Sequence, residues 1–90
     1  MDEVDAREHD ALVLPRRERE VLTLLAAGYS QHQIAERLGI TLSTVRAHLR
    51  RARWRLGCLT SQVAVRVAVD RGAIDPHGID PPPGVDADPE

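Results

Sequence analysis

Arginine is the residue type best placed to do chemistry in this chain, and its spacing is uneven. Five arginines fall within ten residues, at positions 46, 50, 51, 53 and 55, and no acidic residue stands between Glu36 and Asp70. A guanidinium group can fork onto phosphate oxygens or onto the O6 and N7 atoms of guanine. Arg46 and Arg50 would lie one turn apart on a helix. The cluster suits a polyanionic partner, most commonly nucleic acid, but charge alone fits a merely solvated basic face equally well.

The formal net charge of -2 hides a segregation of charge along the chain. Residues 1–15 hold five acids and one arginine, residues 74–90 hold five acids and no base, and residues 16–73 hold eleven arginines and four acids. Proline and glycine crowd the C-terminal end, which cannot bury enough apolar surface to fold. We expect three parts: a flexible acidic arm over 1–13, a folded domain over 14–75 and a disordered, proline-rich acidic tail over 76–90.

Residues that would support catalysis or metal binding show no workable pattern. The chain has no GxSxG motif, no phosphate-binding glycine loop and only one cysteine, Cys58. The four histidines, His9, His32, His48 and His77, lack ligand spacing. We therefore expect a protein that is not an enzyme and uses no cofactor or metal. No signal peptide or membrane-spanning run is apparent, so we expect a cytoplasmic protein with no membrane partner.

Two helical segments are expected before the arginine cluster. Apolar residues at helical spacing run from Arg16 to Ala27, and Gly28 follows as a stop. Pro15 suits the first turn but supplies no side-chain cap. Ser30 opens the second segment, with Gln33 as its capping-box partner, and a glycine ends this segment at position 39.

The arginine cluster lies on a third expected helix, from Leu42 to Leu56, capped by Thr41. At about 100° per residue, Val45, Leu49, Ala52 and Leu56 share a narrow wedge that must face the core. The opposite side carries Ser43, Arg46, Ala47, Arg50, Arg53 and Trp54, flanked by His48, Arg51 and Arg55. A short helix, a glycine-containing turn and a longer helix are the outline of a helix-turn-helix.

The segment from Ser61 to Arg71 is ambiguous on its own residues. Valines alternate at 63, 65, 67 and 69, which indicates a strand. Ala64, Ala68, a potential cap at Thr60 and the closing glycine at 72 favour a helix. The residues leave both structures open.

The stretch LPRREREVLTLLAAGYSQHQIAERLGITLSTVRAHLRRARWRLG resembles the C-terminal DNA-binding domain of LuxR-type regulators, also called GerE-like or NarL/FixJ-type. The similarity continues through Gly57, Thr60, Ala64, Ala68, Gly72 and Ile74. It implies an all-α, compact four-helix domain, in which the second and third helices are the scaffold and recognition helices. It also favours a helix over 61–71.

The resemblance also implies which residues would contact DNA. Arg46, Ala47 and Arg50 match positions that face the bases, and Ser43, Thr44 and Arg51, with Gln31 and His32, match positions that meet phosphate. Arg53 and Arg55, further along the helix, are expected to neutralise backbone charge. The fourth helix often makes a dimer contact, which would use Val63 and Val67. We expect a sequence-specific regulator of transcription that binds double-stranded DNA, acts as a homodimer and associates with the nucleoid.

Three positions depart from the family pattern. Pro15-Arg16 stands where Thr-Pro is usual, and Gln31-His32 replaces a small polar residue followed by lysine. One phosphate contact then depends on protonated His32. Trp54 occupies a usually polar position, where it could pack against the fourth segment, touch a partner or a second copy, or lie along the sugar–phosphate backbone.

Two other functions compete. LPRREREVL and VRAHLRRARWRL also resemble region 4 of extracytoplasmic-function sigma factors, which would make RNA polymerase the partner. Two features count against a sigma-factor module. The interval from Val21 to Ser30 is one residue shorter than is typical of region 4, and the chain continues past Gly57 into a further segment. A protein-binding adaptor, with Trp54 and the valines as contact to another regulator, is the third function.

Overall fold

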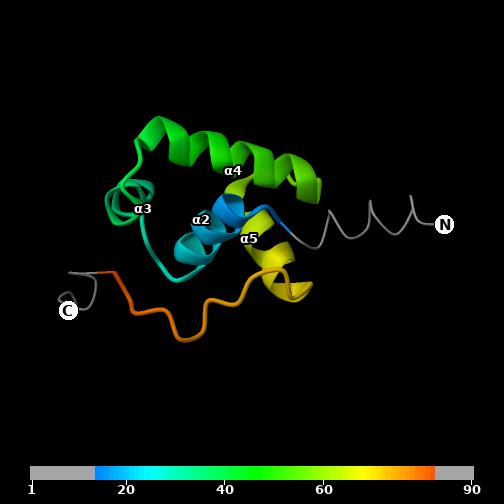
Figure 1. The fold of residues 1–90 in the computed structure, drawn as a ribbon. Helices are drawn as coiled ribbons and strands as arrows, with labels where there is room; N and C mark the ends of the chain where they lie inside the picture. The colour runs from blue at the N-terminus through cyan, green and yellow to red at the C-terminus, as the bar shows by residue number, and fades with distance from the viewer. Residues whose placement is uncertain (1–13, 83–90) are drawn as a thin grey trace.

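The computed structural model describes residues 14–82, which form four helices and no strand. These are α2 (Arg16–Ala26), α3 (Gln31–Leu38), α4 (Leu42–Leu56) and α5 (Ser61–Asp70). The longest helix, α4, packs against each of the other three (Figure 1). The expected all-α, four-helix fold is confirmed. The predicted arm over 1–13 and the last eight residues of the predicted tail lie outside the described residues.

Side-chain caps begin three of the four helices. Ser30 Oγ accepts from the amide of Gln33 at 3.1 Å, and Gln33 Oε1 accepts from the amide of Ser30 at 2.9 Å, which confirms the capping box that opens α3. Thr41 Oγ1 accepts from the amide of Thr44 at 3.0 Å and so caps α4. Gly39 ends α3 with a φ of 69°, a left-handed conformation that side chains with a Cβ rarely adopt. α2 begins at Pro15 without a side-chain cap, as expected.

The ambiguous segment over 61–71 is a helix, α5. Thr60 Oγ1 accepts from the amide of Val63 at 3.1 Å and starts it. Ala64 and Ala68, one turn apart, are fully buried against α2 and α4. Small side chains allow this close packing, and a helix places both of them on one face, one turn apart. Asp70 is the last helical residue, one earlier than the expected end.

One hydrophobic core holds the four helices together. It contains Leu14, Val21, Leu22, Leu24, Tyr29, Ile34, Val45, Leu49, Ala52, Leu56, Ala64, Ala68 and Ile74. Glu18 is the only charged side chain buried with them among the described residues. No helix within residues 14–82 is long and apolar enough to cross a membrane.

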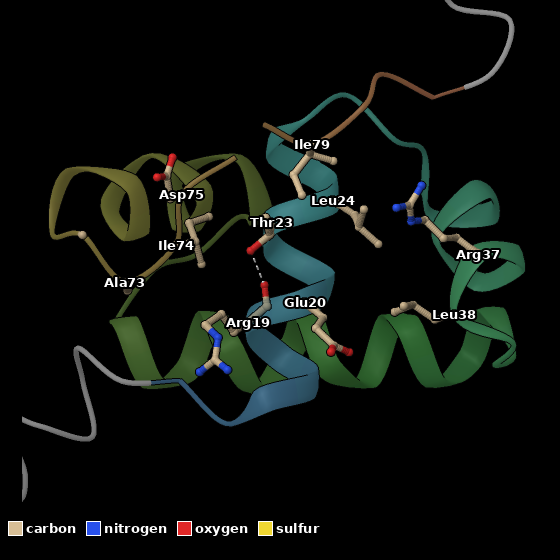
Figure 2. A pocket seen from close by; sticks show the side chains of 11 residues that line it. Arg19, Glu20, Thr23, Leu24, Arg37, Leu38, Ala73, Ile74, Asp75 and Ile79 are labelled. Carbon is tan, nitrogen blue, oxygen red and sulfur yellow. Dashed lines mark hydrogen bonds between the residues drawn. The ribbon is translucent and has the colours of Figure 1, made fainter. Parts of the chain in front are cut away.

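After α5 the chain returns across the helices as an irregular segment, residues 75–82, here called the C-terminal strap (Figure 1). Ile79 packs on the core, and Tyr29 Oη donates to the carbonyl of Asp80 at 3.2 Å. Arg37 Nη1 in turn donates to Tyr29 Oη at 2.6 Å. A groove of about 470 Å³ lies between the strap, α2 and α3 (Figure 2). Residues 76–82 were expected to belong to the disordered tail, and their packing on the core was not predicted from the sequence.

Candidate nucleic-acid interface

The two sides of α4 differ sharply in burial. Val45, Leu49 and Ala52 on the inner side are at most 1% exposed. Arg46 and Arg50 on the outer side are exposed. Burying the apolar wedge therefore fixes the rotation of the helix about its axis and directs the arginines to solvent. None of the residues on α4 is acidic, so no carboxylate of the same helix competes for them.

The start of α3 and the middle of α4 meet at the surface. Gln31, Arg46, Leu49, Arg50 and Arg53 line a shallow depression of about 300 Å³. Arg46 Nε lies 3.4 Å from Gln31 Oε1, a long hydrogen bond that an incoming acceptor could replace at small cost. The structure thus brings together four of the predicted site residues, two of them predicted to read bases and two to bind the backbone.

The other predicted contacts flank this depression on the two helices. Ser43 and Arg51 on α4 and His32 on α3 are exposed, whereas Ala47 is half-buried. Thr44 is also half-buried, and its hydroxyl accepts from Thr41 Oγ1 at 2.9 Å. Thr44 is therefore part of the cap of α4.

Two arginines near the end of α4 make contacts within the protein. Arg55 Nε donates to Glu18 Oε1 on α2 at 2.9 Å. This ion pair engages Arg55 Nε within the protein, and the expected role of Arg55 at the DNA backbone stays a prediction. Arg53 Nη1 lies 3.4 Å from Ser61 Oγ at the start of α5, a weaker contact that leaves Arg53 half-buried.

Glu18 is a structural residue that was not predicted from the sequence. It is 4% exposed and carries the negative charge that balances Arg55. A signal was present, because Glu18 stands four residues after Leu14 and four before Leu22, on the apolar stripe of its helix. An acid at such a position calls for a buried basic partner. Its choice of Arg55, 37 residues away, depends on how α2 crosses α4.

Apolar side chains are exposed where α4 joins α5. Trp54 is 80% exposed, so of its three possible placements, packing against the fourth segment is the one that the structure does not show. Leu59, which the sequence analysis did not single out, is 93% exposed, and Val63 is 50% exposed. Val67 instead packs partly against the core. Of the predicted dimer or partner contacts, Trp54 and Val63 are therefore the accessible ones.

The histidines and acids of residues 14–82 do not converge. No three His, Cys, Asp or Glu side chains in this part of the chain are grouped so that they could hold a metal ion. His48 lies half-buried on α4, and its Nδ1 atom is buried without a hydrogen-bond partner among the described residues. Cys58 is a free thiol. The arrangement suits binding of an extended anion at the α3–α4 surface.

A capped scaffold helix, a glycine turn and a longer helix with arginines on its outer face define a helix-turn-helix domain of the DNA-binding type. The chain belongs to the luxR family of bacterial regulatory proteins, whose GerE sequence pattern matches residues 12–68. This is a family of transcription regulators, which confirms both the resemblance and the expectation that the chain is not an enzyme. It favours the LuxR-type identity over sigma-factor region 4.

Curated relatives agree with the family. The chain is 40% identical over 65 residues to the transcriptional regulatory protein MctR of Rhizobium johnstonii, covering 72% of this chain and 30% of MctR. It is 34% identical over 74 residues to the transcriptional activator protein ExpR of Dickeya dadantii, covering 82% and 30% of the two chains. It is 43% identical over 47 residues to the oxygen regulatory protein NreC of Staphylococcus epidermidis, covering 52% and 22%. The matched region is thus less than a third of each relative. No solved structure matches the chain significantly.

Proposed function

We propose that this domain binds double-stranded DNA sequence-specifically, with α4 in the major groove. Arg46, Ala47 and Arg50 read base edges. Six residues hold the sugar–phosphate backbone: Gln31, His32, Ser43, Thr44, Arg51 and Arg53. The major groove, about 12 Å wide, admits an α-helix. Such a ligand would place the protein at the bacterial nucleoid.

The observation that carries this proposal is the orientation of α4. Its apolar wedge is buried to 1% exposure or less at Val45, Leu49 and Ala52, so Arg46 and Arg50 point away from the core. Both guanidinium groups lack a carboxylate partner among residues 14–82. Arg46 would exchange only its long hydrogen bond to Gln31 for the bidentate contact with guanine O6 and N7, and no carboxylate within these residues competes for Arg50.

Selection of bound sites from random duplexes, followed by titration of variants, tests this assignment. Arg46→Ala and Arg50→Ala should each lose about 1–3 kcal/mol on the selected duplex, or about 5- to 150-fold in affinity, beyond their loss on a random duplex. The extra loss arises because only the selected site offers a guanine to the missing side chain.

Two control variants separate base reading from charge. Arg53→Ala should weaken the selected and random duplexes alike and lower the salt slope by about one. Arg66→Ala, which removes an exposed arginine of α5, should change the affinity for either duplex much less. Equal losses on both duplexes for Arg46→Ala and Arg50→Ala would contradict the reading role.

The proposal extends to a homodimer through α5. Val63 on α5 is half exposed, and Trp54 and Leu59 add apolar surface at the junction with α4. The same selection tests this, because a symmetric dimer yields two inverted half-sites about 34 Å apart, and a single unpaired half-site contradicts it. RNA polymerase or another regulator is the other partner that this apolar surface suits, and co-purification with polymerase core tests that contact.

A further inference from the structure

The C-terminal strap leads the chain to the scaffold-helix end of the candidate interface. Pro82 is buried beside Gly28, where an added Cβ would lie 3.7 Å from Pro82 Cδ. Gly28 stands two residues before Ser30, the N-cap of α3. In Figure 1 the strap runs from the end of α5 past α2 to the side of the molecule where α3 lies. The strap thus ends close to the residues that open the scaffold helix.

Contacts within the described residues hold the strap in this course. Ile79 packs on the core, and Tyr29 Oη donates to the carbonyl of Asp80 at 3.2 Å. Tyr29 is itself 4% exposed and accepts from Arg37 Nη1 at 2.6 Å. The point from which the last eight residues depart is therefore set by packing and hydrogen bonds.

The residues after Pro82 have the charge and length to reach the arginines of α4. Residues 83–90 carry three acids, Asp86, Asp88 and Glu90, and no base. Eight residues span up to about 27 Å when extended. From Gly28 to Gln31 is three residues, or no more than about 11 Å, and Gln31 contacts Arg46. The exposed arginines 46, 50 and 51 lie on the same helix and have no carboxylate partner within residues 14–82.

We propose that the acidic segment 83–90 binds the arginine face of α4 in the free protein and competes there with DNA. This rests on the proposed function, since the contested surface is the DNA-binding one. The strap raises the local concentration of the segment at that surface, so pairs that are individually weak become occupied. The acidic arm over 1–13 is less well placed, because it joins the domain before α2, where Arg16 and Arg17 are already paired with Glu20.

Neutralising the segment in the 90-residue chain tests the competition. One variant combines Asp86→Asn, Asp88→Asn and Glu90→Gln. The matched control combines Asp2→Asn, Glu3→Gln and Asp5→Asn, which changes net charge by the same amount. At about 0.05 M salt the first variant should bind a random duplex about fivefold more tightly than the control, and the difference should vanish at about 0.5 M salt. Equal tightening in both variants would overturn the proposal, because net charge alone would explain it.

A measurement without DNA separates this proposal from the proposed function. A nitroxide attached to Ala87→Cys, in a Cys58→Ser background, keeps all three acids and should broaden the amide signals of Arg46 and Arg50 at low salt more than that of Arg66. The broadening should disappear at high salt as the ion pairs are screened. If no broadening is seen at low salt, the proposal that the segment binds the arginine face of α4 is refuted, even if the chain binds DNA. Broadening in a chain that binds no duplex supports the contact and refutes the DNA-binding proposal.

Discussion

Glu18 and Arg55 show what one buried ion pair does for this domain. Glu18 is 4% exposed, and Arg55 is a third exposed at 2.9 Å from it. Removing one partner of a buried pair leaves an unpaired charge, at a cost of about 3–5 kcal/mol when both are fully buried. Because water partly screens Arg55, we expect Glu18→Gln to lower the free energy of unfolding by about 2 kcal/mol, measured from urea titrations.

Glu20 is the matched control for Glu18 on the same helix. Partial burial raises the pKa of Glu20, but hydrogen bonds from Arg16 and Arg17 outweigh it and hold the pKa below the ordinary 4.5. Its contribution to stability is therefore complete above pH 4.5 and is lost as pH falls through the lowered pKa. Its pairs are exposed, so Glu20→Gln should cost less than about 0.5 kcal/mol at neutral pH. Similar costs for the two variants would show that burial does not set the strength of the Glu18 pair.

At the level of helices, the cap on α4 links stability to the interface. Thr41 Oγ1 accepts from the Thr44 amide, and its removal should cost about 1 kcal/mol. Thr60 caps α5 in the same way, bonding to the Val63 amide at 3.1 Å. We expect Thr41→Ala and Thr60→Ala to lower the free energy of unfolding similarly. Only Thr41→Ala should also weaken duplex binding at temperatures where both are folded, because it loosens the end of α4 that bears Ser43. If both variants bind the duplex equally well, the Thr41 cap does not contribute to DNA binding.

For the molecule as a whole, the strap extends the core beyond the helical residues. Ile79 covers a groove that Leu24 and Ile74 also line (Figure 2). Truncating a fully buried isoleucine costs about 2–5 kcal/mol, and Ile79 is half-buried, so Ile79→Ala should cost about 1 kcal/mol in thermal or urea unfolding. Pro81→Ala, at an exposed position of the strap, should cost much less. If the two variants are equally stable, the strap adds nothing to the fold.

Local sequence signals were sufficient for the central part of the domain. Caps at Ser30 and Thr41, and left-handed glycines at 39 and 57, act within a few residues, so the bounds of α3 and α4 follow from neighbours along the chain. The same periodicity directs Val45 and Leu49 inward and Arg46 and Arg50 outward. Most of the candidate interface lies on these two helices, so its outward residues could be predicted from periodicity, whereas their division into base-reading and backbone-binding residues was implied by the resemblance to LuxR-type domains.

Contacts between residues far apart in the sequence could not be predicted from local signals. The alternating valines of 61–71 fit a strand as well as a helix. In the folded chain this segment is a helix, whose Ala64 and Ala68 are buried against α2 and α4. Glu18 and Arg55 are 37 residues apart and Tyr29 and Asp80 are 51 apart, so no local pattern identifies the partner in either pair, even though the position of Glu18 on an apolar stripe indicates its burial. Such pairs form only when the folded chain brings distant segments together: crossing helices join Glu18 to Arg55, and the strap brings the Asp80 carbonyl to Tyr29.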